Sequence, residues 1–300
     1  MSVVNDGPVR PIRAVSWNLA NRVGDAARRQ GEFLASLSPR PDLVMFQEVN
    51  RRSIETVSER AGLGWFFLAA DLRVPQPDDT PVRQRGVGLA GRGQPPVGLG
   101  IIEGAPLPER TIYGVVPIHG QRVTIASYHA PPGVNWHEKK PAQAVLFARW
   151  LASVQGPVVF GADANTPLLD HPDFELVRTH WQTGARKLNG LPGDDLLWGP
   201  TKVHGLEDAL RRWLSCNPTE SERMRMERPL GPLATSHRTG KRRTCDGTDR
   251  RFDSVWVSKE FQAGAVSYPY DASLRAGSDH SAVIADLTLA CRALLYGVTT

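Results

Sequence analysis

The segment Val158–Pro167 reads VVFGADANTP and joins a strongly apolar run to two polar residues. Its β-branched and aromatic residues predict a short buried strand. Asp163 and Asn165 follow where this strand would end. If the chain turns there, the carboxylate and the amide reach the same pocket. A simple turn before Pro167 is the alternative; it accounts for Asn165 alone but less well for the pair.

Other predicted strands also end in a polar or ionisable residue. These residues are Asn18, Glu48, His129, Asp163 with Asn165, Asp253, and Asp279 with His280. A single Asn or Asp after a strand is usually a turn former. Their repeated occurrence in this order favours one site to which several strand ends contribute.

The spacing of these residues indicates a duplicated layout. AVSWNLA contains Asn18 and is followed about thirty residues later by LVMFQEV with Glu48, and TIASYHA with His129 precedes VVFGADAN with Asp163 by a similar distance. Each half has the order strand, polar residue, helix, strand, acid. Two such units would bring four strand ends to one edge of the molecule, where sheet proteins commonly form sites.

Strands and helices are interleaved along the chain. The runs IRAVSW, LVMFQEV, VTIASYH, PVVFGA, FDSVWVS and SAVIADLTL predict strands. Helical spacing predicts core faces at Ile54, Val57 and Ala61, at Ala142, Leu146, Trp150 and Val154, and at Leu206, Leu210, Trp213 and Leu214. GVGLAG at 86–91 has the letters of a dinucleotide-binding loop, but it reads as a strand and its turn because RGQPP follows in place of a helix. The pattern predicts an α/β sandwich.

Composition limits the class of protein. The chain has 300 residues, of which 41% are apolar and 22% charged, and this balance argues against global disorder. We expect residues 1–300 to form a single domain with a long, partly helical insertion at about 181–250. No apolar run approaches the roughly 18 residues of a membrane span, and the N-terminus has no basic leader, so we expect a cytoplasmic protein.

The net charge of +5 favours an anionic partner such as a nucleic acid or a phosphorylated metabolite. The three cysteines are far apart and lack CxxC spacing, which indicates neither a disulfide framework nor a zinc site. The oligomeric state does not follow from the sequence.

The ordered motifs SWNLA, FQEV, YHAPPG, GADANTP, RFDSVWVS and SDHSAV resemble the endonuclease/exonuclease/phosphatase superfamily over nearly the whole chain. The resemblance implies a four-layered α/β/β/α sandwich of two packed mixed sheets. It also implies divalent-metal-dependent cleavage of phosphate esters, usually with Mg²⁺ and with Mn²⁺ as a substitute.

The acids and amides suit that chemistry. Glu48 offers a hard oxygen ligand for Mg²⁺, and Asn18 could hold the water shell of the metal or a phosphate oxygen. Asp163 could orient or deprotonate the attacking water while Asn165 donates to a phosphoryl oxygen. The alternatives are a buried Glu48 paired with an arginine and plain turns at the two asparagines.

The histidines complete the predicted site. Asp253 could fix the tautomer of His280, which would then stabilise the transition state or act as the acid. The YHAP motif is similar to the deoxyribonuclease pattern, which implies that His129 assists protonation of the leaving group. Asp279 resembles the acid before the last histidine of the family and is expected to bind a metal or polarise His280.

A basic run precedes Asp253 and could line the path of an anionic substrate, although a solvated loop explains it equally well. It contains Arg238, Lys241, Arg242, Arg243, Arg250 and Arg251. We expect a nuclease, with DNA as the favoured substrate. The alternatives are a phosphatase or phosphodiesterase for inositol phosphates or phospholipid headgroups and, with less support, an inactive binding protein with the same fold.

Overall fold

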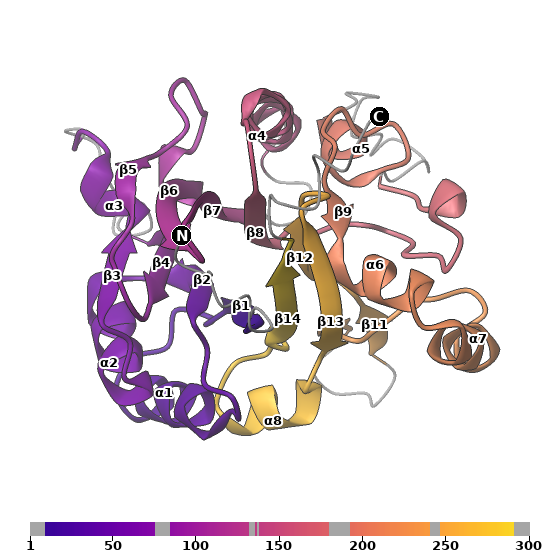
Figure 1. Cartoon of the computed structure of the whole chain (residues 1–300), viewed down its shortest axis with the longest axis horizontal. Helices are drawn as coiled ribbons and strands as arrows, with labels where there is room; N and C mark the ends of the chain where they lie inside the picture. Colours follow the sequence, from indigo (N-terminus) through magenta and orange to yellow (C-terminus); the bar gives the residue numbers. More distant parts are fainter. Residues whose placement is uncertain are drawn as a thin grey trace, which may run out of the picture.

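A computed structural model describes residues 10–75, 85–131, 136, 138–179, 193–240 and 247–290. Two six-stranded sheets pack face to face (Figure 1). The first has the strand order β13-β14-β1-β2-β4-β3 and the second the order β5-β6-β7-β8-β12-β9. A separate two-stranded hairpin, β10-β11, lies beside them.

The first sheet is built from the two ends of the described chain. Its strands are β1 (Ile12–Asn18), β2 (Leu43–Val49), β3 (Trp65–Leu68), β4 (Gly86–Gly91), β13 (Phe261–Ser267) and β14 (Val283–Leu289). Its helices are α1 (Asp25–Ser36), α2 (Arg51–Ala61), α3 (Ala69–Leu72) and α8 (Tyr270–Arg275). The GVGLAG segment is therefore a strand, as predicted.

The middle of the chain forms the second sheet. Its strands are β5 (Val97–Gly100), β6 (Thr111–Ile118), β7 (Gln121–His129), β8 (Val158–Asp163), β9 (Glu207–Asp208) and β12 (Asp253–Val257). The helices of this half are α4 (Lys139–Ser153), α5 (Gly193–Trp198), α6 (Ala209–Ser215) and α7 (Pro218–Glu227), and the hairpin consists of β10 (His237–Thr239) and β11 (Thr248–Arg250). Short 3-10 turns lie at η2 (Pro108–Arg110) and η3 (Phe174–Leu176).

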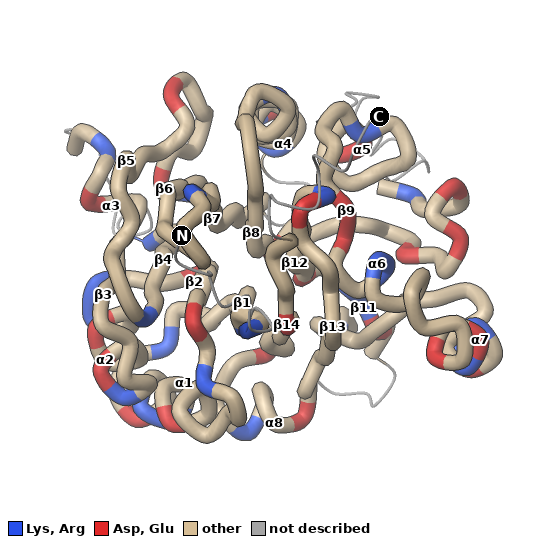
Figure 2. The backbone as a smooth tube through the Cα atoms, in the orientation of Figure 1, with Lys and Arg blue, Asp and Glu red and all other residues tan. Residues whose placement is uncertain are grey.

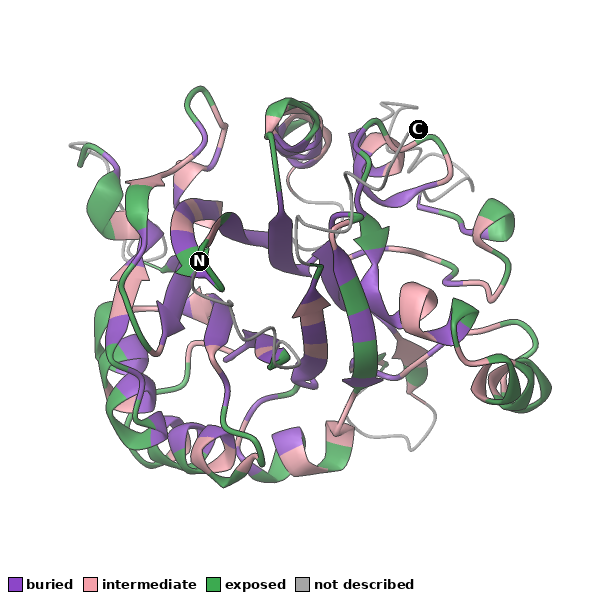
Figure 3. Ribbon diagram, viewed as in Figure 1, coloured by how far each residue is buried: buried purple, intermediate pink, exposed green. Residues whose placement is uncertain are grey.

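Three apolar clusters separate four layers, which confirms the predicted sandwich. One cluster lies between the sheets and includes Met45 and Val159. A second packs α1 and α2 against the outer face of the first sheet, where Trp17 is fully buried. The third packs α4 and α5 against the outer face of the second sheet around Phe147 and Phe160. The central strands are accordingly buried, the edge strand β13 alternates between buried and exposed residues, and the outer faces of the helices are exposed (Figure 3).

The duplicated layout is also confirmed. β1 and β2 are parallel neighbours, and so are β7 and β8, each pair being joined through one helix. Parallel neighbours require such a crossover because a tight hairpin cannot connect them. Asn18 lies opposite Gln47, the residue before Glu48, and His129 lies opposite Asp163. The strand ends that carry polar residues therefore gather at one edge.

The predicted helix at Ile54 and Val57 matches α2, in which both residues are fully buried. Asn50 and Ser53 begin this helix with reciprocal hydrogen bonds, and Gly62 ends it in a left-handed conformation with φ of 66°. Both helix ends are therefore specified locally.

The predicted stripe Ala142, Leu146, Trp150 and Val154 is confirmed in part: all four residues lie half-buried at the edge of the buried face of α4, and Leu146, Trp150 and Val154 pack against the outer cluster. The buried face contains Lys140, Gln143, Ala144, Phe147, Ala148 and Leu151. Gln143 is buried because its amide donates to the carbonyl of Leu107 and accepts from the Leu107 amide, each at 3.1 Å. Apolar spacing alone does not mark this face, because two of its residues, Lys140 and Gln143, are polar.

Leu206 is not part of the helix predicted with Leu210 and Leu214. Asp208 caps α6 by accepting from the backbone N–H of Arg211 at 3.1 Å, so the helix begins after Leu206. Leu206 packs in the outer cluster of the second sheet, whereas Leu210 and Leu214 pack between the sheets.

The segment expected to be an insertion thus contributes β9 and α6 to the sandwich, although residues 180–192 and 241–246 lie outside the described part of the chain. The single-domain organisation stays a prediction. Among the described residues, no helix is both long and apolar enough to cross a membrane.

Candidate active site

Three of the predicted site residues lie in one row across the second sheet. Asp163 at the end of β8 is opposite His129 on β7 and opposite Asp253 on β12. Asp163 is 1% exposed; its Oδ2 accepts from Asn18 Nδ2 at 2.8 Å and its Oδ1 from the backbone N–H of Asn165 at 3.0 Å. Burial raises the pKa of Asp163. The residue therefore joins the two sheets at the centre of the site.

His280 and Asp253 form the predicted couple. His280 Nδ1 lies 2.8 Å from Asp253 Oδ2 and 3.9 Å from Asp163 Oδ2. Burial lowers the pKa of His280, but Asp253 and Asp163 outweigh it and raise that pKa to about 10. Trp17 Nε1 donates to the backbone carbonyl of His280 at 3.0 Å and fixes the chain there. The imidazole is therefore held as a cation between two carboxylates.

Glu48 is presented by a distortion of β2. Its φ is 49°, and the pairing of β2 with β4 shifts register between Phe46 and Val49, so the irregular backbone redirects the side chain. Asn21 Nδ2 donates to Glu48 Oε2 at 2.9 Å. Asn21 also has a positive φ, of 53°. Such conformations are sparse for residues other than glycine and cluster at functional sites.

The charges around Glu48 fit a divalent cation. Its side chain is 31% exposed, in contrast to the buried Asp163. Burial raises the pKa of Glu48, and the nearby carboxylates of Asp163 and Asp279 raise it further. Carboxylates that repel one another are stabilised by a cation between them. Glu48 is the accessible one, and its oxygens are the hard donors that Mg²⁺ prefers.

The two asparagines serve first to position their neighbours. Asn18 is fully buried, and its Oδ1 accepts from the backbone N–H of Ala20 at 2.8 Å while its amide donates to Asp163. Asn165 adopts a φ of 45° and donates from Nδ2 to the carbonyl of Ala130 at 3.0 Å. Lys140 Nζ donates to the carbonyl of Asn165 at 3.0 Å. The metal contact expected of Asn18 stays a prediction.

Asp279 lies at the exposed rim of the site, next to His280. His237, which the sequence did not single out as functional, stacks on His280 with ring centroids 4.4 Å apart, and its Nδ1 lies 3.1 Å from the carbonyl oxygen of Asp279. The hairpin β10-β11 brings His237 there, so local sequence patterns gave no signal for it.

Ser236 is a second residue that the sequence did not indicate. Its Oγ accepts from the backbone N–H groups of Phe252 and Asp253, at 2.8 and 3.1 Å. Its carbonyl accepts from the N–H of Ser281 at 2.7 Å, and its own N–H donates to Arg250 at 2.8 Å. Fully buried, Ser236 ties the chain around Asp253 to the chain that follows His280.

His129 lies against a third missed residue, Arg110 at the end of η2. Arg110 Nη1 is 3.1 Å from His129 Nδ1, whereas Nε2 of the imidazole is 3.4 Å from Asp163 Oδ2 and 3.7 Å from Glu48 Oε1. Burial holds the pKa of His129 well below its usual value, and the charge of Arg110 adds to the effect. His129 is therefore neutral, unlike His280.

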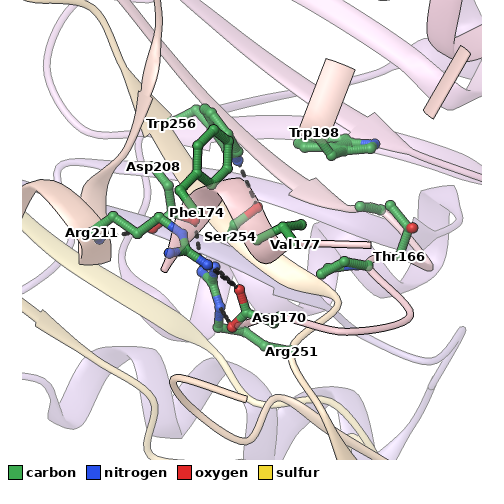
Figure 4. A pocket seen from close by; sticks show the side chains of 12 residues that line it. Thr166, Asp170, Phe174, Val177, Trp198, Asp208, Arg211, Arg251, Ser254 and Trp256 are labelled. Carbon is green, nitrogen blue, oxygen red and sulfur yellow. Dashed lines mark hydrogen bonds and ion pairs between the residues drawn. The ribbon is translucent and has the colours of Figure 1, made fainter. Parts of the chain in front are cut away.

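Arg251 corrects one expectation about the basic run. Its side chain is 5% exposed and pairs with Asp170 at 2.6 Å and with Asp208 at 2.7 Å (Figure 4). Its Nη1 also donates to the Tyr268 hydroxyl, which donates to the carbonyl of Asp253 at 3.0 Å. Because its donors are used inside the protein, Arg251 braces Asp253 and does not line a path for substrate.

The other basic residues lie in different surroundings. Arg238 is exposed and pairs with Asp249 at 2.8 Å. Arg250 donates to the carbonyl of Leu168 and lines a cavity of about 230 Å³ beside Asn165. Lys241, Arg242 and Arg243 lie outside the described residues. On α7 Arg223 pairs with Glu220 and Glu227, so part of the charge is balanced locally (Figure 2).

The group Asp163, Asp253 and His280 has ligand atoms within 4.8 Å of one another, as a metal site would. However, His280 Nδ1 is already bonded to Asp253, and all three residues are buried. We therefore interpret the group as a hydrogen-bonded cluster, and the metal contact expected of Glu48 stays a prediction.

Comparison with known proteins gives the fold a name. The sequence matches no protein-family model and no curated protein. An endonuclease/exonuclease/phosphatase from Beutenbergia cavernae is 19% identical, with a TM-score of 0.60, over 94% of this chain and 72% of that one. This chain has the endonuclease/exonuclease/phosphatase fold.

Two further structures share this fold. The human Nocturnin catalytic domain, solved with a bound sulfate anion, is 16% identical with a TM-score of 0.59 and covers 94% of this chain and 96% of its own. D. rerio TDP2, solved with a single-strand DNA product, is 16% identical with a TM-score of 0.58. The match covers 93% of this chain and 99% of the TDP2 chain. The resemblance stated from the sequence motifs is confirmed at the level of the fold.

Proposed function

We propose that this protein is a divalent-metal-dependent phosphoesterase that hydrolyses nucleic-acid phosphodiesters. One observation carries the proposal: the imidazoles of His129 and His280 lie 3.4 Å and 3.9 Å from Asp163 Oδ2, and the accessible carboxylate of Glu48 lies 3.7 Å from the His129 ring. An acceptor for a proton, donors for developing negative charge and a cation site thus converge on one point.

The residues support in-line attack by water on phosphorus. Asp163, whose pKa is raised by burial, is suited to orient the water or to accept its proton. His280, held by Asp253, places a positive charge where negative charge grows on the phosphoryl oxygens. Because His280 already carries a proton in this environment, Asp163 is the better candidate for the general base.

A divalent cation fits beside this cluster. Glu48, with Asp279 at the rim, would hold Mg²⁺, and Mn²⁺ offers similar coordination. The bound cation would polarise a phosphoryl oxygen and offset charge in the transition state.

Nucleic acid is preferred as the substrate for two reasons, the net charge of the chain and its similarity to a structure solved with DNA. The chain carries a net charge of +5, which attracts a polyanion. The similar D. rerio TDP2 was solved with a single-strand DNA product. Inositol phosphates and phospholipid headgroups offer the same phosphate chemistry and are alternative substrates. The cytoplasmic location stays a prediction.

The test is a substrate panel assayed with Mg²⁺, with Mn²⁺ and with EDTA. It contains supercoiled plasmid, abasic duplex, bis-p-nitrophenyl phosphate and inositol phosphates. We expect nicking of DNA that EDTA abolishes. Release of phosphate from inositol phosphates alone would move the substrate to the alternative class. No turnover with either metal would contradict the proposal and favour a binding protein.

A further inference from the structure

Arg110 lies behind the imidazole of His129, on the side away from the two carboxylates. Its Nη1 is 3.1 Å from Nδ1 of His129 and donates to the carbonyl of Ala130 at 3.3 Å. The indole ring of Trp136 covers the guanidinium, with its centroid 5.2 Å from Cζ. The guanidinium is therefore held in one position relative to the imidazole.

This contact determines which nitrogen of His129 carries the proton. A guanidinium has N–H donors and no acceptor, so Nδ1 can bond to Arg110 only through its lone pair. In a neutral imidazole the proton is then on Nε2. Nε2 lies 3.4 Å from Asp163 Oδ2 and 3.7 Å from Glu48 Oε1, both longer than an ordinary hydrogen bond. The Nε2 proton thus faces the space between two carboxylates without a close partner there.

Asn165 is compatible with this arrangement. Its Nδ2 is 3.5 Å from His129 Nε2, which is too long for a good hydrogen bond. The same nitrogen donates to the carbonyl of Ala130 at 3.0 Å. Asn165 therefore does not need the lone pair of Nε2.

We propose that Arg110 is a positioning residue that fixes His129 in the Nε2–H tautomer, aimed at the reacting phosphoryl group. The role rests on the proposed phosphoesterase function. His129 then serves as a preorganised hydrogen-bond donor to a phosphoryl oxygen and keeps its proton throughout. This differs from the role implied by the sequence resemblance, in which His129 helps to protonate the leaving group.

The tautomer can be measured without any activity. In protein labelled with ¹⁵N at histidine, long-range ¹H–¹⁵N spectra distinguish a protonated ring nitrogen from one with a free lone pair, and H129A assigns the resonance. We expect a lone pair on Nδ1 and a proton on Nε2 in the wild type. In R110M we expect a mixture of tautomers, and in R110K partial recovery. R122M, which alters an exposed arginine of β7, is the matched control and should leave the spectrum unchanged.

A proton on Nδ1 in the wild type, or a spectrum of R110M identical to the wild type, would overturn the proposal. Because the measurement does not need turnover, it decides the tautomer even if no phosphate ester is hydrolysed, an outcome that would refute only the proposed function.

Kinetics test whether Arg110 acts through His129. With bis-p-nitrophenyl phosphate and Mg²⁺, we expect R110M to lower kcat by roughly 10- to 100-fold while KM changes by less than about twofold, since the loss is confined to a transition-state donor. The double variant R110M/H129A should be no slower than H129A. If the two losses multiply, Arg110 acts on the substrate independently of His129, and the positioning role is refuted.

Discussion

Asp163 is the side chain on which the polar groups of the site converge. Asn18 and the backbone of Asn165 donate to it, and the imidazoles of His129 and His280 lie within 4 Å of its Oδ2. A carboxylate held by this many groups has one orientation, so it would also orient a water molecule that binds to it. The orientation of the Asp163 carboxylate therefore depends on contacts from a few buried residues.

Replacing Asp163 or His280 should lower turnover while leaving the protein folded. We expect D163A and H280A each to lose at least about 100-fold in kcat, the usual contribution of an acid–base or charge-stabilising group. The matched control is E32Q, on the exposed face of α1, which should keep normal turnover. Thermal melting of each variant checks the fold. A folded D163A with nearly normal turnover would remove Asp163 from the mechanism.

Asp170 should make the protein sensitive to acid. Burial alone would raise its pKa, but Arg251 and Arg211 outweigh it and lower the pKa from 3.8 to about 2. A carboxyl with a lowered pKa in the folded state stabilises the fold above pH 3.8 and loses this contribution as the pH falls toward 2. The loss amounts to about 2 kcal/mol.

Urea unfolding between pH 5 and 2 measures that loss. In D170N the dependence on pH in this window should be weaker, and stability at pH 7 should fall by about 3–5 kcal/mol because Arg251 keeps its buried charge. An unchanged pH profile in D170N would show that other carboxyl groups control acid unfolding.

The site residues differ in how far sequence could predict them. Those that follow an apolar strand, such as Glu48 and Asp163, were found because the strand pattern marks their position. Arg110 and Ser236 were missed because they come from a 3-10 turn and a loop, where no periodicity marks a functional side chain. Only their hydrogen bonds to distant residues identify them.

At the level of elements, the start of β12 is tied by hydrogen bonds to Ser236, which precedes it in the sequence, and through Ser236 to Ser281, which follows it. Ser236 accepts from the backbone N–H groups of Phe252 and Asp253, just as this strand begins. The same residue bonds to Ser281, the neighbour of His280. The hairpin β10-β11 and strand β12 therefore set the position of the Asp253–His280 couple together.

The variant S236A should weaken this connection. Two backbone N–H groups lose their acceptor, which costs about 1–3 kcal/mol of stability. A small displacement of Asp253 should reduce kcat by about 10- to 100-fold, since reactions of this kind depend on sub-ångström placement. S267A, at the exposed end of β13, is the matched control. If S236A melted earlier but kept full turnover, Ser236 would contribute only to stability.

The buried face of a helix could be predicted from the sequence where only apolar residues are buried. It was predicted less well where polar residues are buried too. Helix α2 was predicted with its correct face. The buried face of α4 was predicted only in part, because it includes Lys140 and Gln143, which donate to backbone carbonyls. Apolar spacing cannot anticipate such partners, because they belong to segments far away in the sequence.

The whole molecule depends on a close approach of the two sheets beneath the site. A Cβ atom on Gly161 of β8 would lie 2.6 Å from Ser16 Oγ and 2.9 Å from Met45 Cβ, both on the facing sheet. Gln47 Nε2 donates across the same gap to Ser127 Oγ at 3.1 Å and, within its own sheet, to Ser16 Oγ at 3.2 Å. A glycine at 161 is therefore required for the sheets to meet.

We expect G161A to separate the sheets locally and to destabilise the protein by about 1–3 kcal/mol, as overpacked cores do. Asn18 and Asp163 lie on opposite sheets, so turnover should fall as well. G205A is the matched control, because an added Cβ there meets no atom within 4 Å. Chemical unfolding and kcat together check the effect, and a G161A protein as stable as the wild type would refute the tight approach.

The row of His129, Asp163 and Asp253 has a further consequence. Neighbouring strands keep a separation of about 4.8 Å because their backbone hydrogen bonds impose it. Strand pairing therefore sets the spacing of these three side chains, whatever the sequence of the loops above them. The loops above the ladder can therefore vary in sequence while the spacing of these three side chains stays the same.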